Sequence, residues 1–292
     1  MGEVTIEALY EQVRSRVPVR GDDAVPMVEP VAPGIRVLAL RTPTLPPAAH
    51  TNVYLVGPAS GPVAVVDPGS PYADQQAVLD RYLETVPIAL VVLTHHHGDH
   101  VGGAVALATR WNVPIAAHPA TARRLAGRVP VTQLVEDGAV VHGMTAVHTP
   151  GHAEGHLCFE VGTALIAGDM VAGVGTILID PSEGDMALYL ASLERMAERG
   201  QRTLLPAHGP AIVDGQSKLA EYLAHRRMRE QRVLDALQPG GGAGASVGEL
   251  VAIAYDDTPR LLWPLAERSL LAHLIKLRTE GRAQESAGRW SA

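Results

Sequence analysis

Cysteine and aromatic residues are scarce in this sequence. Cys158 is the single cysteine among 292 residues, which excludes a disulfide framework within the chain and a cysteine-rich zinc site. Aromatic residues make up 4% and include one phenylalanine, so a buried core has to be assembled mainly from alanine, valine and leucine. Apolar residues nevertheless reach 47%, which is enough for one large domain or for one domain with a smaller companion.

Positive charge and long apolar segments are also lacking. The formal net charge is −7, which argues against a protein whose whole surface binds nucleic acid. No uninterrupted apolar run approaches the roughly 18 residues that a membrane-spanning helix needs. The N-terminal stretch MGEVTIEALYEQVRSRVPVR alternates charged with apolar side chains and lacks the apolar centre of a signal peptide. We therefore expect a cytoplasmic protein that does not contact a membrane.

Short apolar runs bounded by glycine and proline predict strands along most of the chain. They stand at residues 35–40, 51–57, 63–69, 88–94, 113–118, 144–149, 156–162, 163–169 and 203–209. Helical spacing is found at residues 5–16, 73–86, 101–111 and 185–200, and an irregular proline-rich extension is expected up to residue 34. Predicted strands and helices alternate in two successive sets along the chain. This arrangement favours an α/β fold with two sheets inside and helices outside, a four-layer αββα sandwich. Spacing alone also fits an ordinary doubly wound sheet.

The composition changes after about residue 215. A strongly helical segment at 217–237 is followed by the glycine-rich QPGGGAGAS, and Ser246 is placed to cap the next helix. A last helix at 262–282 is closed by Gly281. Three helices with a tight turn and a short tail resemble a winged helix. We therefore expect a main domain at 1–215 and an all-α winged-helix-like domain at 216–292.

Four polar segments follow predicted strands directly, at the ends where α/β sheets place their functional sites. They are HHHGDH at 95–100, HTPGH at 148–152, AGDM at 167–170 and PAHG at 206–209. Neutral imidazole and carboxylate are the ligands that suit zinc and related divalent ions. A solvated polar loop would explain the first segment alone, but it does not explain all four. The sequence therefore predicts a metal centre.

The spacing within the first segment divides its members between two ions. His95 and His97 are two positions apart, so an extended loop aims both at one ion. Asp99 and His100 then point elsewhere and are placed to hold a second ion, while Asp169 is the candidate carboxylate that bridges the two. Two such ions lower the pKa of a shared water to about 7 and polarise a carbonyl or phosphoryl oxygen.

The four segments together resemble the metallo-β-lactamase superfamily in its glyoxalase-II-like branch. The motifs T-H-H-H-G-D-H, T-P-G-H, G-D and A-H-G occur in the family's order, and the resemblance covers about residues 35–210. It implies that Asp99 also orients the bridging hydroxide and moves its proton. The commonest true β-lactamases carry cysteine where this chain has Asp169, which argues against a dedicated β-lactamase. The resemblance implies one ligand set of His95, His97 and His152 and a second of Asp99, His100 and His208, with Asp169 bridging.

The C-terminal segment at about 216–283 is similar to the winged-helix extension of the β-lactamase-like protein 2 group in that superfamily. Some relatives in the group cut single-stranded RNA, and others with related catalytic domains hydrolyse acyl-carrier thioesters. The resemblance therefore implies the architecture more firmly than the substrate.

Two enzymatic hypotheses and one binding hypothesis follow. The leading one is a hydrolase with two divalent ions, zinc first and iron or manganese as alternatives. In it the bridging hydroxide attacks the acyl carbon of a thioester, ester, lactone or lactam, carried by a small molecule or an acyl carrier. The alternative is a single-stranded RNA endoribonuclease using the same centre. A non-catalytic binding module that kept the fold is the third.

Charge asymmetry leaves the RNA alternative open. Residues 216–292 contain 11 Lys and Arg against 9 Asp and Glu, whereas the rest of the chain contains 13 against 22. The arginines at 226–232 could therefore attract phosphate, although a helix that also carries acidic residues usually presents a solvated face. A winged helix can equally serve as a lid or as the surface of a homodimer.

Several further groups are assigned outside the ligand set. His96 and His148 are expected to point away from the metals, and His156 is expected to orient a ligand or cap a strand. His118 is a candidate for the substrate cleft. Asp67 is expected either to hold a ligating histidine or to form a turn. Cys158 is interpreted as a core residue.

Overall fold

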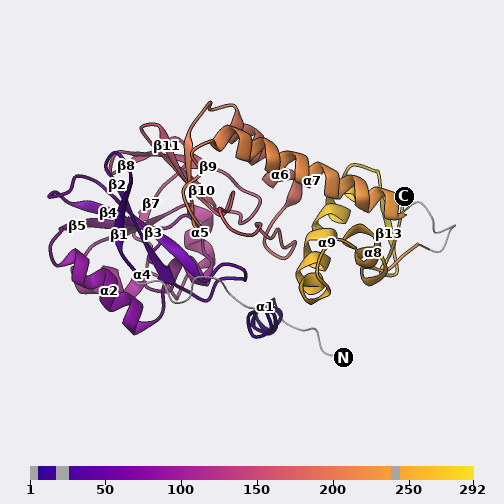
Figure 1. Cartoon of the computed structure of the whole chain (residues 1–292), viewed down its shortest axis with the longest axis horizontal. Helices are drawn as coiled ribbons and strands as arrows, with labels where there is room; N and C mark the ends of the chain where they lie inside the picture. The colour runs from indigo at the N-terminus through magenta and orange to yellow at the C-terminus, as the bar shows by residue number, and fades with distance from the viewer. Residues whose placement is uncertain (1–5, 18–25, 238–243) are drawn as a thin grey trace.

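The computed structural model describes residues 6–17, 26–237 and 244–292 of the chain. Two sheets face each other in the larger part of the molecule, and a long helix leads from them to a smaller helical part (Figure 1). One apolar cluster lies between the sheets, and two others lie between a sheet and the helices outside it. The expected four-layer αββα sandwich is therefore confirmed.

The first sheet has seven strands in the order of the sequence, antiparallel from β1 to β4 and parallel from β4 to β7. Strand β4 shows why its segment is apolar throughout. Val65 packs toward the outer helices while Val66 packs toward the other sheet, so both faces are buried. The strands are β1 (Val28–Ala32), β2 (Ile35–Arg41), β3 (His50–Val56), β4 (Val63–Val66), β5 (Ile88–Val92), β6 (Ile115–Ala117) and β7 (Gln133–Leu134).

The second sheet has five strands in the order β12-β11-β10-β9-β8, with one parallel pair, β11 and β12. The single phenylalanine, Phe159 on β10, is fully buried between the sheets. Its neighbour Cys158 faces the outer helices and is also fully buried, as expected for a core residue. The strands are β8 (Val140–Val141), β9 (Met144–His148), β10 (Leu157–Val161), β11 (Ala164–Gly168) and β12 (Thr203–Pro206).

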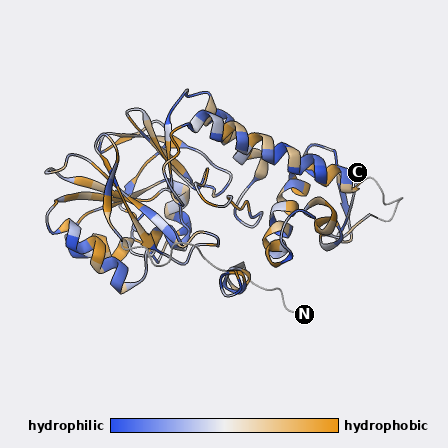
Figure 2. Cartoon of the chain, in the orientation of Figure 1, coloured by the Kyte–Doolittle hydropathy of each residue, from blue (hydrophilic) through white to orange (hydrophobic). Residues whose placement is uncertain are grey.

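Helices of the sandwich agree with the predicted segments, with two differences. The segment predicted at 101–111 begins later, as α4 at residue 104, and is preceded by a single turn, α3, at 98–101; neither this turn nor the short helix α5 was predicted. Hydropathy alternates along α2, whose Leu79 and Leu83 are buried against the first sheet (Figure 2). These helices are α1 (Ile6–Arg14), α2 (Ala73–Leu83), α3 (Gly98–Val101), α4 (Ala104–Trp111), α5 (Pro119–Arg124) and α6 (Met186–Ala197).

The extension predicted to be irregular up to residue 34 contains strand β1, so that prediction was wrong for residues 28–32. Its residues pair antiparallel with β2, from Val28 opposite Leu38 to Ala32 opposite Ile35. Pro30 is tolerated because β1 is the edge strand of the sheet, where one side of the backbone needs no partner. Pairing with a neighbouring strand therefore overrides the local proline signal.

The C-terminal part is built around α7 (Gly215–Leu237), α8 (Val247–Ala254) and α9 (Trp263–Thr279), with a short 3-10 turn η1 (Arg260–Leu262). Ser246 and Glu249 form the expected cap of α8 reciprocally, side chain to backbone. Strands β13 (Gln284–Ser286) and β14 (Arg289–Ser291) form a hairpin, so the winged helix is not all-α. Each strand has three residues, too few for a recognisable alternation.

Helix α7 takes part in both hydrophobic cores. Tyr222 near its start packs against the second sheet, whereas Val233 near its end packs in the winged-helix core. The predicted boundary at 215 coincides with the start of this helix and stays a prediction, because one rigid element belongs to both sides. No helix in the described part of the chain is both long and apolar enough to cross a membrane.

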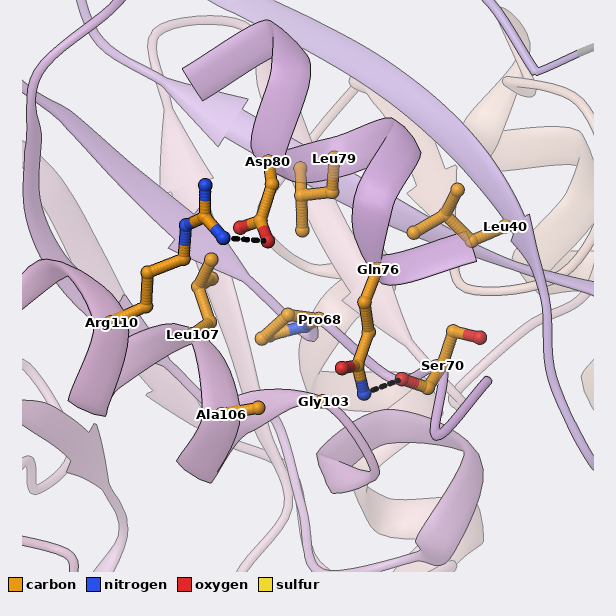
Figure 3. A pocket seen from close by; sticks show the side chains of 10 residues that line it. All are labelled: Leu40, Pro68, Ser70, Gln76, Leu79, Asp80, Gly103, Ala106, Leu107 and Arg110. Carbon is orange, nitrogen blue, oxygen red and sulfur yellow. Dashed lines mark hydrogen bonds and ion pairs between the residues drawn. The ribbon is translucent and has the colours of Figure 1, made fainter. Parts of the chain in front are cut away.

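The turn after α3 allows a close approach of two backbones. A methyl group added at Gly102 would lie 2.5 Å from the carbonyl oxygen of Gly69, and one added at Gly103 would lie 2.7 Å from that of Pro68. The two glycines therefore let the start of the helix pack against the loop after β4. Beside this contact, a cavity of about 230 Å³ lies between α2 and α4, closed by the Arg110–Asp80 ion pair (Figure 3).

Candidate metal centre

All seven predicted ligands come together at one edge of the sandwich. They follow the carboxyl ends of β5, β9, β11 and β12, which the two sheets bring side by side. Their nitrogen and oxygen atoms form two groups, within each of which the atoms lie no more than 4.8 Å apart. The first group is His95, His97, His152 and Asp169, and the second is Asp99, His100 and His208.

The first group has the dimensions of a tetrahedral ion site. His95 Nε2 and His97 Nδ1 are 2.9 Å apart, and His152 Nε2 is 3.3 Å and 3.0 Å from them. Nitrogens at 2.0–2.1 Å from a tetrahedral ion are about 3.3 Å from one another. Three ring nitrogens therefore already converge to within a few tenths of an ångström of that arrangement.

The carboxylate of Asp169 lies between the two groups. Its Oδ2 is 3.5 Å from His152 Nε2 in the first group. Its Oδ1 is 3.5 Å from His100 Nε2 and 3.3 Å from His208 Nε2 in the second. One oxygen for each group is the geometry that a bridging carboxylate requires.

Two buried atoms that face each other between the groups, His100 Nε2 and Asp169 Oδ1, have no hydrogen-bond partner within the described chain. Asp99 completes the second group with Oδ2 at 3.6 Å from His208 Nε2. A buried polar atom without a partner carries a substantial free-energy cost of desolvation, so its presence needs a reason. A cation bound between these atoms would satisfy both, and the residues therefore fit a divalent metal ion.

The outward nitrogen of each histidine in the second group is held by an oxygen of the sandwich. His100 Nδ1 donates to Asp67 Oδ2 at 2.8 Å, and His208 Nδ1 donates to the carbonyl oxygen of His50 at 2.9 Å. These contacts set the tautomer in which Nε2 carries the lone pair that a metal needs. Of the two roles expected for Asp67, the structure shows the contact with a ligating histidine.

Asp67 is itself fixed in place by Thr94. The backbone nitrogen of Thr94 donates to Oδ1 at 2.8 Å and its hydroxyl donates to Oδ2 at 2.6 Å. The φ angle of Asp67 is 50°, in the left-handed region that side chains other than glycine seldom adopt. The strained backbone of Asp67 thus lies where its carboxylate meets His100, a predicted metal ligand.

Two histidines of the first group, His97 and His152, are oriented by a different segment, whereas His95 Nδ1 lies 3.0 Å from the hydroxyl of Thr94. His152 Nδ1 donates to the carbonyl oxygen of Leu178 at 2.9 Å. His97 Nε2 and His96 Nε2 each contact one oxygen of Glu183, both at 2.9 Å. His96 therefore points away from the predicted metal positions, as expected. Glu183 was missed, because nothing in DPSEGD distinguishes it from an acidic residue in a turn.

Burial and the neighbouring imidazoles keep His95 and His152 neutral. Burial, reinforced by the imidazole of His97, lowers the pKa of His152 to about 4. Burial likewise holds the pKa of His95 well below its ordinary value, with the neighbouring imidazoles adding to the effect. For Asp169, burial alone would raise the pKa, but the imidazoles of His208 and His100 outweigh it and hold the pKa well below the usual range. Neutral imidazole and ionised carboxylate are the forms that bind metal.

The sequence model of the metallo-beta-lactamase superfamily matches residues 46–208, and that of the beta-lactamase associated winged helix domain matches residues 246–290. The chain belongs to the metallo-β-lactamase superfamily. The family resemblance inferred from the motifs and the winged-helix tail is thereby confirmed, and the His/Asp cluster is one that suits a metal ion. Which metal and how many ions bind stay predictions.

Three related sequences and one solved structure resemble this chain over most of its length. Lactamase-like protein vrtG of Penicillium aethiopicum is 35% identical, covering 84% of this chain and 85% of its own. The beta-lactamase-like protein 2 homolog of Drosophila melanogaster is 30% identical, with coverages of 86% and 90%. Atrochrysone carboxyl ACP thioesterase nsrC of Aspergillus novofumigatus is 33% identical, with coverages of 80% and 74%. A beta-lactamase domain protein from Burkholderia ambifaria superimposes with a TM-score of 0.78 at 25% identity, covering 93% of this chain and 98% of that one.

Three histidines near the metal cluster have structural roles outside the predicted ligand set. His118, the candidate for the cleft, caps α5 through Nδ1 and stacks on His148 with ring centroids 4.2 Å apart, so that expectation was wrong. His156 Nε2 accepts a hydrogen bond from the backbone nitrogen of Asp169 at 3.1 Å. It therefore holds the backbone of Asp169 and lies outside the predicted ligand set.

A cavity of about 970 Å³ opens directly onto the cluster. His97, Asp99 and Asp169 form part of its wall, and helices α7 and α9 of the C-terminal part close the opposite side. Tyr10 of α1 also lines it. Much of the remaining wall is apolar, contributed by Leu45, Pro46, Pro47, Ala172, Val174, Ile177, Leu178, Leu262, Leu265 and Ala266.

The arginines at 226–232 form hydrogen bonds and ion pairs within the molecule. Arg226 and Arg229 retain only 3% and 8% of their exposure, so the expectation of a solvated face was wrong for both. Arg229 Nη1 lies 2.8 Å from Asp257 Oδ1, and Arg232 Nη1 lies 3.0 Å from Asp257 Oδ2. Arg227 is exposed but lies 2.7 Å from Glu194. Each of these three has a carboxylate partner, and they form no free basic surface.

Proposed function

We propose that this protein is a metal-dependent hydrolase that cleaves an acyl bond, a thioester foremost, with ester, lactone and lactam as related substrates. The convergence of two donor groups on the two oxygens of Asp169 carries the proposal. Two divalent ions there would lower the pKa of water to about 7 and polarise the carbonyl oxygen under attack. Histidine and carboxylate donors suit zinc best, with iron or manganese as alternatives.

Asp99 is the carboxylate that we assign to proton transfer. It lines the cavity, and its side chain is 16% exposed against 10% for Asp169, which is engaged by both groups. For Asp99, burial alone would raise the pKa, but the imidazoles of His100 and His208 lower it below its ordinary value. An ionised carboxylate facing the substrate space can take the proton of the attacking water and deliver it to the leaving group.

The cavity supports an acyl substrate with an apolar body. Its wall between the cluster and the winged helix is rich in proline, leucine and alanine. These side chains suit a hydrocarbon chain better than the charged phosphate backbone of RNA. The printed name of one relative, an ACP thioesterase, supports the same choice. We therefore propose an acyl chain, free or on an acyl carrier, held in this cavity with its carbonyl carbon at the cluster.

A metal assay combined with a substrate panel tests the proposal. The purified full-length protein is expected to hold two divalent ions, and to hydrolyse at least one thioester among thioester, ester, lactone, lactam and phosphodiester substrates. Extraction with a chelator should abolish turnover, and returning zinc, iron or manganese should restore it. Fewer than one ion per chain would instead support a binding module that has kept the fold.

Single-stranded RNA remains the alternative substrate to be excluded by experiment. Two cavity residues, Arg124 and Arg128, have no carboxylate within ion-pair distance among the described residues, and these cations could meet phosphate. RNA binding with a steep salt dependence that weakens in Arg124→Gln/Arg128→Gln would favour this alternative. Absent or salt-independent binding, together with acyl turnover, would favour the hydrolase of acyl bonds.

A further inference from the structure

The loop at residues 177–183, between β11 and α6, touches both halves of the molecule. On the side of the metal cluster it supplies the carbonyl oxygen of Leu178 to His152 and the carboxylate of Glu183 to His97. These are two of the three histidines in the first group. The rotation of both rings therefore depends on where this loop lies.

Helices of the C-terminal part hold the same loop from its other side. Arg268 on α9 donates from Nε to Asp180 Oδ2 at 2.9 Å and from Nη2 to Asp180 Oδ1 at 2.7 Å. Arg226 on α7 donates to the carbonyl oxygen of Ile177. Both contacts are well shielded, since Asp180 is 3% exposed and Arg226 is also 3% exposed. A two-pronged arginine–carboxylate contact fixes direction as well as distance.

Asp180 is also hydrogen-bonded to the residues that follow it in the loop. Its Oδ1 accepts hydrogen bonds from the backbone nitrogen and the hydroxyl of Ser182, at 2.9 Å and 2.7 Å. Its carbonyl oxygen accepts from the nitrogens of Glu183 and Gly184, at 3.2 Å and 2.7 Å. The turn that presents Glu183 to His97 is thus built on the residue that Arg268 clamps.

From this chain of contacts we propose that the winged-helix part positions the first group of metal ligands, with Arg268 as a positioning residue acting through Asp180. This rests on the metal assignment made under the proposed function. The second group serves as an internal control, because its histidines are held by Asp67 and by His50 within the sandwich. Loosening the loop should therefore weaken the ion of the first group and spare that of the second.

The test compares Arg268→Gln with Arg278→Gln in the full-length protein. Arg278 lies on the same helix, but its carboxylate neighbour, Glu285, belongs to the winged-helix hairpin. Stepwise competition with a coloured chelator for Zn²⁺ measures the two affinities, well below the unfolding temperature of each variant. His152→Ala and His208→Ala identify which step belongs to which group.

In Arg268→Gln we expect about tenfold weaker Zn²⁺ binding in the step that His152→Ala removes, within the 10- to 100-fold range typical of groups that orient metal ligands. The other step should not change, Arg278→Gln should match the parent protein, and Arg268→Lys should restore part of the loss. A variant that loses thermal stability while both affinities stay unchanged would show that Arg268 only joins the two parts.

Failure of this inference is separable from failure of the proposed function. If the parent protein binds no Zn²⁺, the metal assignment fails. If the parent binds two ions and Arg268→Gln binds both as tightly, the assignment stands and only the positioning role is overturned. Equal weakening of both steps would also contradict it, since the geometry connects Arg268 to the first group alone.

Discussion

Polar side chains are buried both in the cluster at the strand ends and at Arg226 and Arg229 on α7. Along α7, the buried guanidinium of Arg229 meets Asp257 and the carbonyl oxygen of Ala254. At the strand ends, His100 Nε2 and Asp169 Oδ1 have no hydrogen-bond partner in the described chain. Both sets retain buried atoms without a hydrogen-bond partner, including Arg226 Nε and Arg229 Nε. The two guanidinium groups nevertheless donate to oxygens of the chain, whereas the histidines of the cluster turn ring nitrogens toward one another.

The contacts that a buried polar side chain makes distinguish a structural role from a ligand-binding role more clearly than the residue types do. Both segments attract attention in the sequence, as a run of histidines and a run of arginines. Because buried polar groups are normally paired, the set whose ring nitrogens turn toward one another is the one arranged for a ligand. The set that finds carboxylates and carbonyls within the chain is arranged for stability. Substituting a residue of the cluster should therefore reduce metal binding, whereas substituting a buried arginine should reduce stability.

The largest effect is expected from His97→Ala. It removes one of the three converging nitrogens of the first group, so one ion should be lost and turnover should fall by about a thousandfold or more. Metal quantification and initial rates on the acyl substrate measure both. The matched control is His118→Ala, a histidine that also follows a strand but caps α5. Full activity in His97→Ala would remove that residue from the proposed centre.

A smaller effect is expected from Asp67→Asn, which keeps the shape of the side chain but removes its charge. The contact with His100 Nδ1 weakens, so affinity for the ion of the second group should fall by about 10- to 100-fold. Chelator competition measures the change, with the exposed Asp74→Asn as a control. Unchanged affinity would mean that Asp67 only shapes the turn.

For the arginines the expected loss is of stability and not of metal. Arg229→Met should lower the free energy of unfolding by about 1–3 kcal/mol, a range reduced because Asp257 is 45% exposed. Arg227→Gln, an exposed pair with Glu194, should change it by about 0.5 kcal/mol or less. Urea denaturation measures both, and metal content should match the parent protein. A loss of metal in Arg229→Met would break the distinction between the two sets.

The smallest effect is expected at Cys158. Burial raises the pKa of its thiol to about 12, so the reactive thiolate is negligible at pH 8. Alkylation of the native protein should therefore be very slow and should leave turnover unchanged, whereas the unfolded protein should react readily. Rapid loss of activity on alkylation would place this cysteine nearer the chemistry than its position between β10 and the outer helices indicates.

The seven residues of the cluster could be predicted because they belong to four short motifs, each of which follows a strand that is apolar enough to recognise. Once a strand is identified, the position of the next few residues at the sheet edge follows from chain connectivity. Glu183 could not be predicted in the same way. It reaches His97 across 86 positions, from a loop whose shape depends on Asp180 and on a helix still further along the chain.

The sequence by itself determined the residue types of the centre, their order, the α/β class of the fold and the winged helix at its end. These follow from local periodicity and from short motifs, whose geometry is set within a few residues. Only the tertiary structure decided that Arg226 and Arg229 are buried, that a cavity lies between the cluster and the C-terminal helices, and that Arg268 holds the loop beside the first group. Those outcomes depend on contacts between distant segments, and a charged side chain carries no local mark of the partner that it will meet.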